Sequence, residues 1–106
     1  MFRSTTAVKN VLPTEVQRRL DSGESLQIID VREAYEVARG KIPNARNIRL
    51  SEIPRRLGEI DRNREVIVVC LTGARSAAAC HMLAGQGFST VSNMVGGMSA
   101  WRGPVA

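Results

Sequence analysis

The stretch VIVVCLTGARS at residues 66–76 predicts the centre of a β-sheet and the loop that leaves it. Residues 66–69 are all β-branched, and such a run is typical of a strand that is buried on both faces of a sheet. Cys70 follows directly and begins a loop over residues 70–75. Small residues then predict a helix over 76–86. The loop therefore connects a buried strand to the start of a helix.

Strand and helix patterns alternate on both sides of this stretch. Apolar residues recur at every fourth position from Leu12 to Leu20 and predict an amphipathic helix over 13–22. Glu15 and Arg19 are expected to pair on the surface of that helix. The other expected elements are a strand at 26–30, a short helix at 33–39, a weaker strand at 45–50, a helix at 51–60, a strand at 88–91 and a last helical turn that holds Trp101.

The connections between these strands decide the fold class. Each connection has ten or more residues and contains a helix, so the strands cannot form hairpins. Units of this kind build a mostly parallel sheet with right-handed crossovers and helices on both faces. The predicted fold class is therefore α/β. A chain of 106 residues is long enough for one modest core, and we expect a single domain over residues 1–106.

Charge and composition narrow the classes of function. Fifteen Lys and Arg residues against ten Asp and Glu residues give a net charge of +5, which can draw small anions toward a site. The arginines are scattered along the chain, and the four aromatic residues offer no stacking surface. Nucleic acid is therefore not an expected partner.

Hydropathy and cysteine content point to a cytoplasmic protein without a membrane partner. No apolar run approaches the roughly 20 residues that span a bilayer, and the first ten residues lack the apolar stretch of a secretory signal. Cys70 and Cys80 lie in one strand, loop and helix segment, where a disulfide would have no obvious loop to close. Reduced thiols are expected.

The loop after the central strand has the features of a nucleophile site. Gly73 allows a tight turn that points successive backbone N–H groups inward, which makes a cradle for an anion. Cys70 should face the positive end of the following helix, with Arg75 close by. Both effects lower the pKa of a thiol, and the thiolate is the nucleophilic form. Alternatively, Cys70 is a small apolar residue that ends a buried strand. Arg75 would then be an ordinary surface arginine near a helix start.

Several separated segments together resemble the rhodanese homology domain over nearly the full length of the chain. They are IDVRE at 29–33, GKIPNARNI at 40–48, CLTGARS at 70–76, GF at 87–88 and VGGMSAW at 95–101. The resemblance implies a three-layer fold around a five-stranded sheet. It also implies that the 70–76 loop is the active loop.

The function that the resemblance implies is sulfur transfer in two steps. The Cys70 thiolate would take the outer sulfur of thiosulfate or of a persulfide donor, and a thiol or cyanide would then accept it from the Cys70 persulfide. The binding residues would be those whose backbone N–H groups surround the sulfur: Leu71, Thr72, Gly73, Ala74, Arg75 and Ser76. No metal or organic cofactor is expected. Some relatives that use thiosulfate carry cations directly after the cysteine, so Leu71 and Thr72 favour a protein or low-molecular-weight persulfide as donor.

Other polar and reactive residues lie in segments that are expected near this loop. Asp30 and Arg32 end a strand next to the central one, where they could line the pocket rim or form an ion pair that supports the loop. Glu36 would be a natural partner for Arg32. Cys80 is expected in the core, the alternative being a resolving thiol for the nucleophile. His81 is expected at the surface, and without a second histidine or a carboxylate cluster no metal site is expected.

Two other functions are the alternatives to sulfur transfer by an enzyme of small substrates. A cysteine-dependent phosphatase or arsenate reductase needs five residues between cysteine and arginine to surround a tetrahedral oxyanion, whereas only four separate Cys70 from Arg75. A partner-specific sulfur-relay or binding module would use the same fold with little turnover of small molecules. Comparing thiosulfate with persulfide donors distinguishes this module from an enzyme of small substrates.

Overall fold

Val66–Val69 forms β4, the middle strand of a five-stranded sheet in the computed structural model, which describes residues 6–106. The strand order is β1-β5-β4-β2-β3, and each neighbouring pair is parallel. The other strands are β1 (Val8–Val11), β2 (Gln27–Asp30), β3 (Arg46–Asn47) and β5 (Val91–Met94). The α/β class and the parallel sheet are therefore confirmed, with the β-branched run at the centre.

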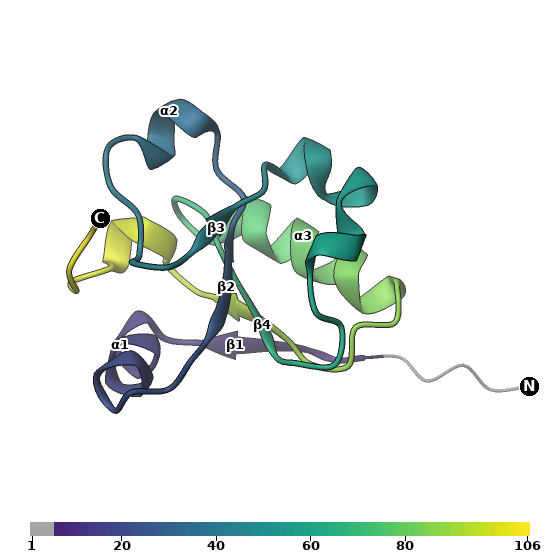
Figure 1. Ribbon diagram of the computed structural model, residues 1–106, viewed down its shortest axis with the longest axis horizontal. Helices are drawn as coiled ribbons and strands as arrows, with labels where there is room; N and C mark the ends of the chain where they lie inside the picture. The colour runs from purple at the N-terminus through teal and green to yellow at the C-terminus, as the bar shows by residue number, and fades with distance from the viewer. Residues whose placement is uncertain (1–5) are drawn as a thin grey trace, which may run out of the picture.

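Helices cover both faces of the sheet. Figure 1 shows α1 (Pro13–Asp21) on one side and α3 (Ala74–Gly85) on the other. The α3 side also carries two short 3-10 helices, η1 (Leu50–Arg55) and η2 (Leu57–Glu59). A short helix, α2 (Ala34–Val37), follows β2, and η3 (Gly97–Ala100) follows β5. The connections that contain α2, α3 and η3 all begin at the carboxyl edge of the sheet, beside the end of β4.

Side-chain alternation along β4 divides the core into two halves. Ile67 and Val69 belong to the cluster on the α1 side, together with Trp101. Val66 and Val68 belong to the cluster on the α3 side. Because successive side chains of a strand point to opposite faces, the next residue, Cys70, falls on the α3 side, and it is part of that cluster. The parity of the strand thus directs the thiol toward the start of α3.

The structure corrects several expected elements. β1 at Val8–Val11 was not anticipated, because its two middle residues are exposed and polar and mask the strand pattern. The expected strand at 88–91 lies instead at Val91–Met94, since the amide of Phe88 bonds to the Leu83 carbonyl and closes α3. The expected helix at 51–60 is two 3-10 helices, one of which contains Pro54, a residue without an amide donor.

The remaining elements lie close to their expected places with shorter or shifted bounds. The strand expected at 45–50 is reduced to two residues, and the helix expected at 33–39 is a single turn. On α1, the ion pair expected between Glu15 and Arg19 does not form. Glu15 pairs with Arg18 instead, and Arg19 reaches Glu65 at 2.8 Å, because the body of the protein lies on its side of the helix.

Candidate active site around Cys70

The Cys70 sulfur lies at the carboxyl edge of the sheet, between the end of β4 and the first turn of α3. Gly73 is the N-cap of α3 and has a φ of 106°, a left-handed conformation that a residue with a Cβ rarely adopts. This turn folds the loop back over its own first residue. The Gly73 amide then donates to the Cys70 Sγ at an N···S distance of 3.1 Å. The glycine turn expected from the sequence is therefore present.

Ser76 and Asn93 extend the polar surroundings of the sulfur. The Ser76 Oγ lies 3.3 Å from the Cys70 Sγ and donates to the Asn93 Oδ1 at 2.5 Å. The Asn93 Nδ2 donates in turn to the Gly73 carbonyl at 3.1 Å. All of these side chains are buried. A closed chain of hydrogen bonds thus links the Cys70 thiol, the first turn of α3 and strand β5.

Two opposing effects set the protonation of the thiol. Burial raises the pKa of Cys70, because a thiolate is poorly solvated inside a protein. Hydrogen bonds from the Ser76 side chain and from the backbone amides of Ser76, Gly73 and Thr72 lower it. The hydrogen bonds prevail, and the pKa of Cys70 lies below that of an ordinary cysteine. This direction agrees with the expectation of an activated thiol.

The Cys70 side chain is nevertheless completely covered. Cys70 has 0 % exposure, although its sulfur faces the loop amides rather than only apolar side chains. Leu71 and Thr72, which follow it, are exposed, as is Ala74 at the start of α3. A reagent therefore meets the 71–74 backbone and side chains before it reaches the sulfur.

The C-terminal 3-10 helix η3 fixes the other side of the loop. The Met98 amide donates to the Cys70 carbonyl at 2.8 Å, and the Ser99 amide donates to the Leu71 carbonyl at 2.9 Å. A Cβ at Gly97 would collide with these same carbonyls, so only a glycine allows the approach. The VGGMSAW segment thus holds the active loop through backbone contacts.

Arg75 is held by α2. Its guanidinium donates to both carboxylate oxygens of Glu36, at 2.7 and 2.8 Å. The hydrogen bonds from Arg75 lower the pKa of Glu36 from an ordinary 4.5 to about 2, so the pair is ionised throughout the neutral range. The sequence suggested Glu36 as the partner of Arg32, and the structure shows this contact through the backbone alone: the Arg32 Nη1 donates to the Glu36 carbonyl at 3.4 Å, whereas the Glu36 carboxylate binds Arg75. Arg75 is a partner of α2, with its charge compensated before any substrate arrives.

Asp30 and Arg32 form the buried ion pair that was considered for them. The Arg32 guanidinium lies 2.8 Å from the Asp30 carboxylate and also donates to the Gly40 carbonyl at 2.8 Å. Both residues are buried. The pair supports the segment after α2 rather than the 70–76 loop. Arg32 lines the pocket beside the loop, whereas Asp30 does not.

The other reactive side chains lie outside the loop. Cys80 is buried in the core on the α3 side, and burial raises the pKa of its thiol to about 12. His81 is exposed, as expected. Within residues 6–106, no three His, Cys, Asp or Glu side chains gather in a way that could hold a metal ion. In the same part of the chain, no helix has the length and apolarity of a membrane span.

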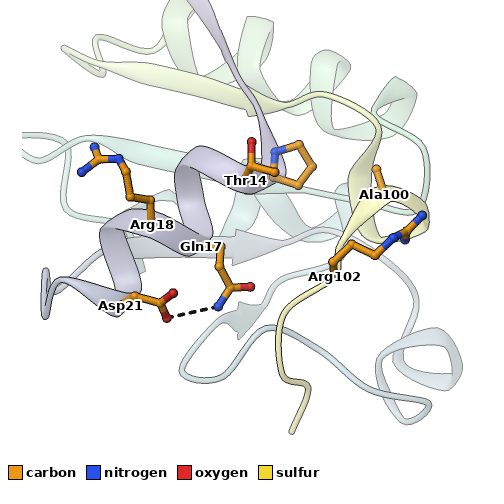
Figure 2. A pocket seen from close by; sticks show the side chains of 7 residues that line it. Thr14, Gln17, Arg18, Asp21, Ala100 and Arg102 are labelled. Carbon is orange, nitrogen blue, oxygen red and sulfur yellow. Dashed lines mark hydrogen bonds between the residues drawn. The ribbon is translucent and has the colours of Figure 1, made fainter.

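Two surface pockets differ in their position relative to the loop after β4. One, of about 360 Å³, adjoins the active loop; its lining residues are Arg32, Tyr35, Glu36, Arg39, Gly40, Leu71, Met98 and Val105. The other, of about 310 Å³, lies between α1 and the end of η3 with the residues that follow it, and Figure 2 shows Gln17 and Asp21 hydrogen-bonded to each other on its wall. No residue of the 70–76 loop lines the second pocket.

Sequence reasoning missed two residues that shape the site. Asn93 was missed because the strand that carries it was placed three residues too early. A buried asparagine between Val91 and Met94 was the available signal, since a polar side chain inside a strand usually has a specific partner. Gly97 was quoted as part of a motif, but its contact with the loop carbonyls depends on how η3 packs.

Fold and site together define an α/β protein in which a buried cysteine with a lowered pKa lies in an amide-lined loop at the carboxyl edge of the sheet. The model of the rhodanese-like domain family matches residues 12–104. The chain belongs to this family.

Individual relatives cover most of the chain. It is 41% identical over 96 residues to the putative sulfurtransferase YtwF of Bacillus subtilis, covering 91% of this chain and 92% of the relative. It is 37% identical over 94 residues to a sulfurtransferase of Allochromatium vinosum, covering 89% and 88%. The crystal structure of a rhodanese-like domain protein from Staphylococcus aureus superposes with a TM-score of 0.87 at 34% identity, covering 92% of this chain and 96% of that one.

Proposed function

We propose that this protein is a sulfurtransferase that carries sulfane sulfur as a persulfide on Cys70. The observation that carries the proposal is the ring of donors around the sulfur, formed by Ser76 and by the amides of Thr72 and Gly73. Such donors stabilise a thiolate before the reaction and a persulfide anion after it. Relatives that are named sulfurtransferases support the same activity.

The first half-reaction loads the sulfur. The Cys70 thiolate attacks the outer sulfur of the donor, and a bond forms between that sulfur and the Sγ. The bond that held the outer sulfur to the donor breaks, and its electron pair leaves with sulfite from thiosulfate or with a thiolate from an organic persulfide. The amides of the loop then face the terminal sulfur of the Cys70 persulfide. The chain needs no cofactor for this exchange.

The charges around the loop favour an organic persulfide over thiosulfate. Leu71 and Thr72 carry no charge, and Glu36 already neutralises Arg75. Thiosulfate, a dianion, would therefore be stabilised mainly by amide dipoles. An organic persulfide carries less charge and loses less solvation on entering such a site.

Intact-mass analysis tests the proposal. After treatment with a persulfide donor, the wild-type chain is expected to gain the mass of one sulfur atom, and cyanide should remove it. Cys70→Ala should gain nothing. Cys80→Ala is the matched control, because that thiol is also buried but is held largely protonated by its raised pKa, and this variant should load like wild type. Loading of Cys70→Ala, or no loading of wild type, contradicts the proposal.

A partner-specific relay is the second candidate, and the complete burial of Cys70 favours it. In a relay, docking of a protein donor would open the loop. The discriminating measurement compares thiosulfate with a small organic persulfide, following sulfite release and cyanide consumption. Rapid loading by the small persulfide supports the enzyme, whereas loading by neither supports the relay. Phosphate-ester turnover that is lost in Cys70→Ser would support a phosphatase instead.

A further inference from the structure

The surface beside the active loop concentrates the exposed apolar side chains of the molecule. Four large hydrophobic residues are exposed within residues 6–106, and three of them, Tyr35, Leu71 and Val105, line the same pocket. Their exposures are 72%, 42% and 57%. Leu71 immediately follows the nucleophile. An exposed apolar cluster at this place is typical of a binding surface.

We propose that this pocket, named here the acceptor pocket, binds an organic thiol that has an apolar body and a carboxylate, and presents its sulfur to the Cys70 persulfide. The inference rests on the proposed sulfur transfer and adds the chemical class of the acceptor.

The walls of the acceptor pocket are held in place by backbone contacts. The Ala106 amide donates to the Lys41 carbonyl at 2.9 Å, and the Val105 side chain packs against Gly40, 3.1 Å from where a Cβ on that glycine would stand. Met98, another lining residue, is fixed by the hydrogen bond from its amide to the Cys70 carbonyl. A preformed apolar pocket binds a ligand without the cost of ordering its own walls.

The charges of the pocket select an anion. Two of its charged side chains are already compensated: Arg32 by Asp30, and Glu36 by Arg75. The Arg39 side chain has no ion-pair or hydrogen-bond partner among the described residues. One uncompensated guanidinium on an apolar wall suits a ligand with a single carboxylate.

The size of the pocket indicates a small molecule. A volume of about 360 Å³ lies near the lower end of the range for small-molecule sites. Thiosulfate has no apolar part that could use the walls. A thiol with a chain of several methylene groups would bury them against Tyr35, Leu71 and Val105.

The transfer step is balanced without any further reagent. The acceptor thiolate attacks the outer sulfur of the Cys70 persulfide, and a new sulfur–sulfur bond forms. The bond between the outer sulfur and the Cys70 Sγ breaks, and its electron pair stays on the Sγ. The products are the acceptor persulfide and the Cys70 thiolate, which the loop amides stabilise.

Single-turnover kinetics test the apolar part of the proposal. The persulfide is formed with excess donor, the donor is removed, and discharge is followed with 6-mercaptohexanol and 2-mercaptoethanol. Second-order rate constants should favour the longer thiol by about tenfold, which corresponds to burial of about two of its four additional methylene groups at about 0.8 kcal/mol each. Tyr35→Ser and Val105→Ser should each reduce that preference by about threefold. The control Leu12→Ser removes the fourth exposed hydrophobic, which lies outside the pocket, and should leave the preference unchanged.

A second pair of thiols tests the carboxylate. The wild type should prefer 6-mercaptohexanoate over 6-mercaptohexanol by about threefold, a modest factor because the pair is near solvent. Arg39→Gln should abolish this preference, whereas Arg55→Gln, an exposed arginine on η1, should retain it. Equal rates for all thiols in the wild type, or an unchanged preference in the pocket variants, overturn the acceptor pocket while leaving sulfur transfer intact.

A binding measurement separates failure of this inference from failure of the proposed function. Hexanoate has no thiol and should bind the unloaded protein. Tyr35 is the only tyrosine of the chain, so its ring signals in NMR report on the pocket directly. Saturable shifts that are lost in Arg39→Gln support the pocket, even if Cys70 takes up no sulfur. The absence of saturable shifts in the wild type contradicts it.

Discussion

At the scale of single residues, a few neighbouring side chains and amides set the reactivity of the Cys70 thiol. Strand parity turns its side chain toward α3, and Gly73 brings an amide to within 3.1 Å of the sulfur. Ser76 has one hydroxyl proton and two neighbours that can accept it, the sulfur and the Asn93 carbonyl oxygen. The position of that proton therefore contributes to the reactivity of the thiol.

Removing the Ser76 hydroxyl should make the thiol less acidic. The Ser76 side chain lowers the pKa of Cys70, so Ser76→Ala is expected to raise it. Alkylation of Cys70 by iodoacetamide near pH 7 should slow by about tenfold, the worth of a hydrogen bond to a charged group. The measurement is the pH dependence of the alkylation rate. Ser51→Ala, at an exposed position on η1, is the control. An unchanged profile in Ser76→Ala would show that the hydroxyl does not stabilise the thiolate.

At the scale of elements, the active loop is clamped between α2 and η3. The Glu36–Arg75 pair joins the single turn of α2 to the first turn of α3. In η3, the amides of Met98 and Ser99 donate to the carbonyls of Cys70 and Leu71. Neither α2 nor η3 would be stable as an isolated helix, because both are shorter than the length at which helices persist in water. Each is held by the contacts that also position the loop.

Breaking the link between α2 and α3 should destabilise the protein in a pH-dependent way. Glu36 has a pKa of about 2 in the folded state, below its ordinary 4.5. Its contribution to stability is therefore complete above about pH 5 and is lost as the pH falls toward 2. Glu36→Gln should cost about 1 to 2 kcal/mol at pH 7, a value reduced for the solvent exposure of Arg75.

Urea unfolding at a series of pH values measures this effect. The free energies of unfolding of wild type and Glu36→Gln should converge as the pH is lowered. Glu24→Gln, a more exposed carboxylate paired with Arg19, is the control and should change stability less. A difference that stays constant from pH 7 to below pH 3 would show that the ion pair is not its source.

At the scale of the whole molecule, the parallel sheet gathers distant segments at one edge. Asp30, Cys70 and Asn93 lie at or near the carboxyl ends of three adjacent strands. This edge carries the loop, the ion pairs of α2 and the acceptor pocket, whereas the pocket of Figure 2 is formed by α1 and the segment after η3. In addition, the net charge of +5 attracts anions to the molecule as a whole.

The overall charge predicts a salt dependence for anionic donors. The rate of Cys70 persulfide formation from thiosulfate should fall by a few-fold as ionic strength rises from about 20 mM to about 200 mM, because the Debye length shortens. Alkylation of Cys70 by iodoacetamide, a neutral reagent, is the control reaction and should show little change. The measurement is the initial rate of each modification of Cys70 by mass spectrometry. An equal salt effect on both reactions would rule out steering by the protein charge.

The amino-acid sequence by itself determined the central strand, the glycine-containing loop that follows it and the fold class. These features are local: four β-branched residues specify a buried strand, and the cysteine, the glycine and the serine that surround the sulfur lie within seven consecutive residues. The position of the loop at the carboxyl edge of the sheet could be inferred because the loop directly follows the central strand in the chain. The order of residues already places the thiol at a helix start.

The tertiary structure alone decided the partners of those residues. β1 pairs at the sheet edge despite a polar pattern, because β5 offers it free backbone groups. The Glu36 carboxylate binds Arg75 rather than Arg32, and Asn93 reaches Gly73, because packing brings segments 20 or more residues apart into contact. The acceptor pocket likewise needs Tyr35, Leu71 and Val105 on one surface. Side-chain pairing of this kind depends on how elements pack, which local sequence patterns do not encode.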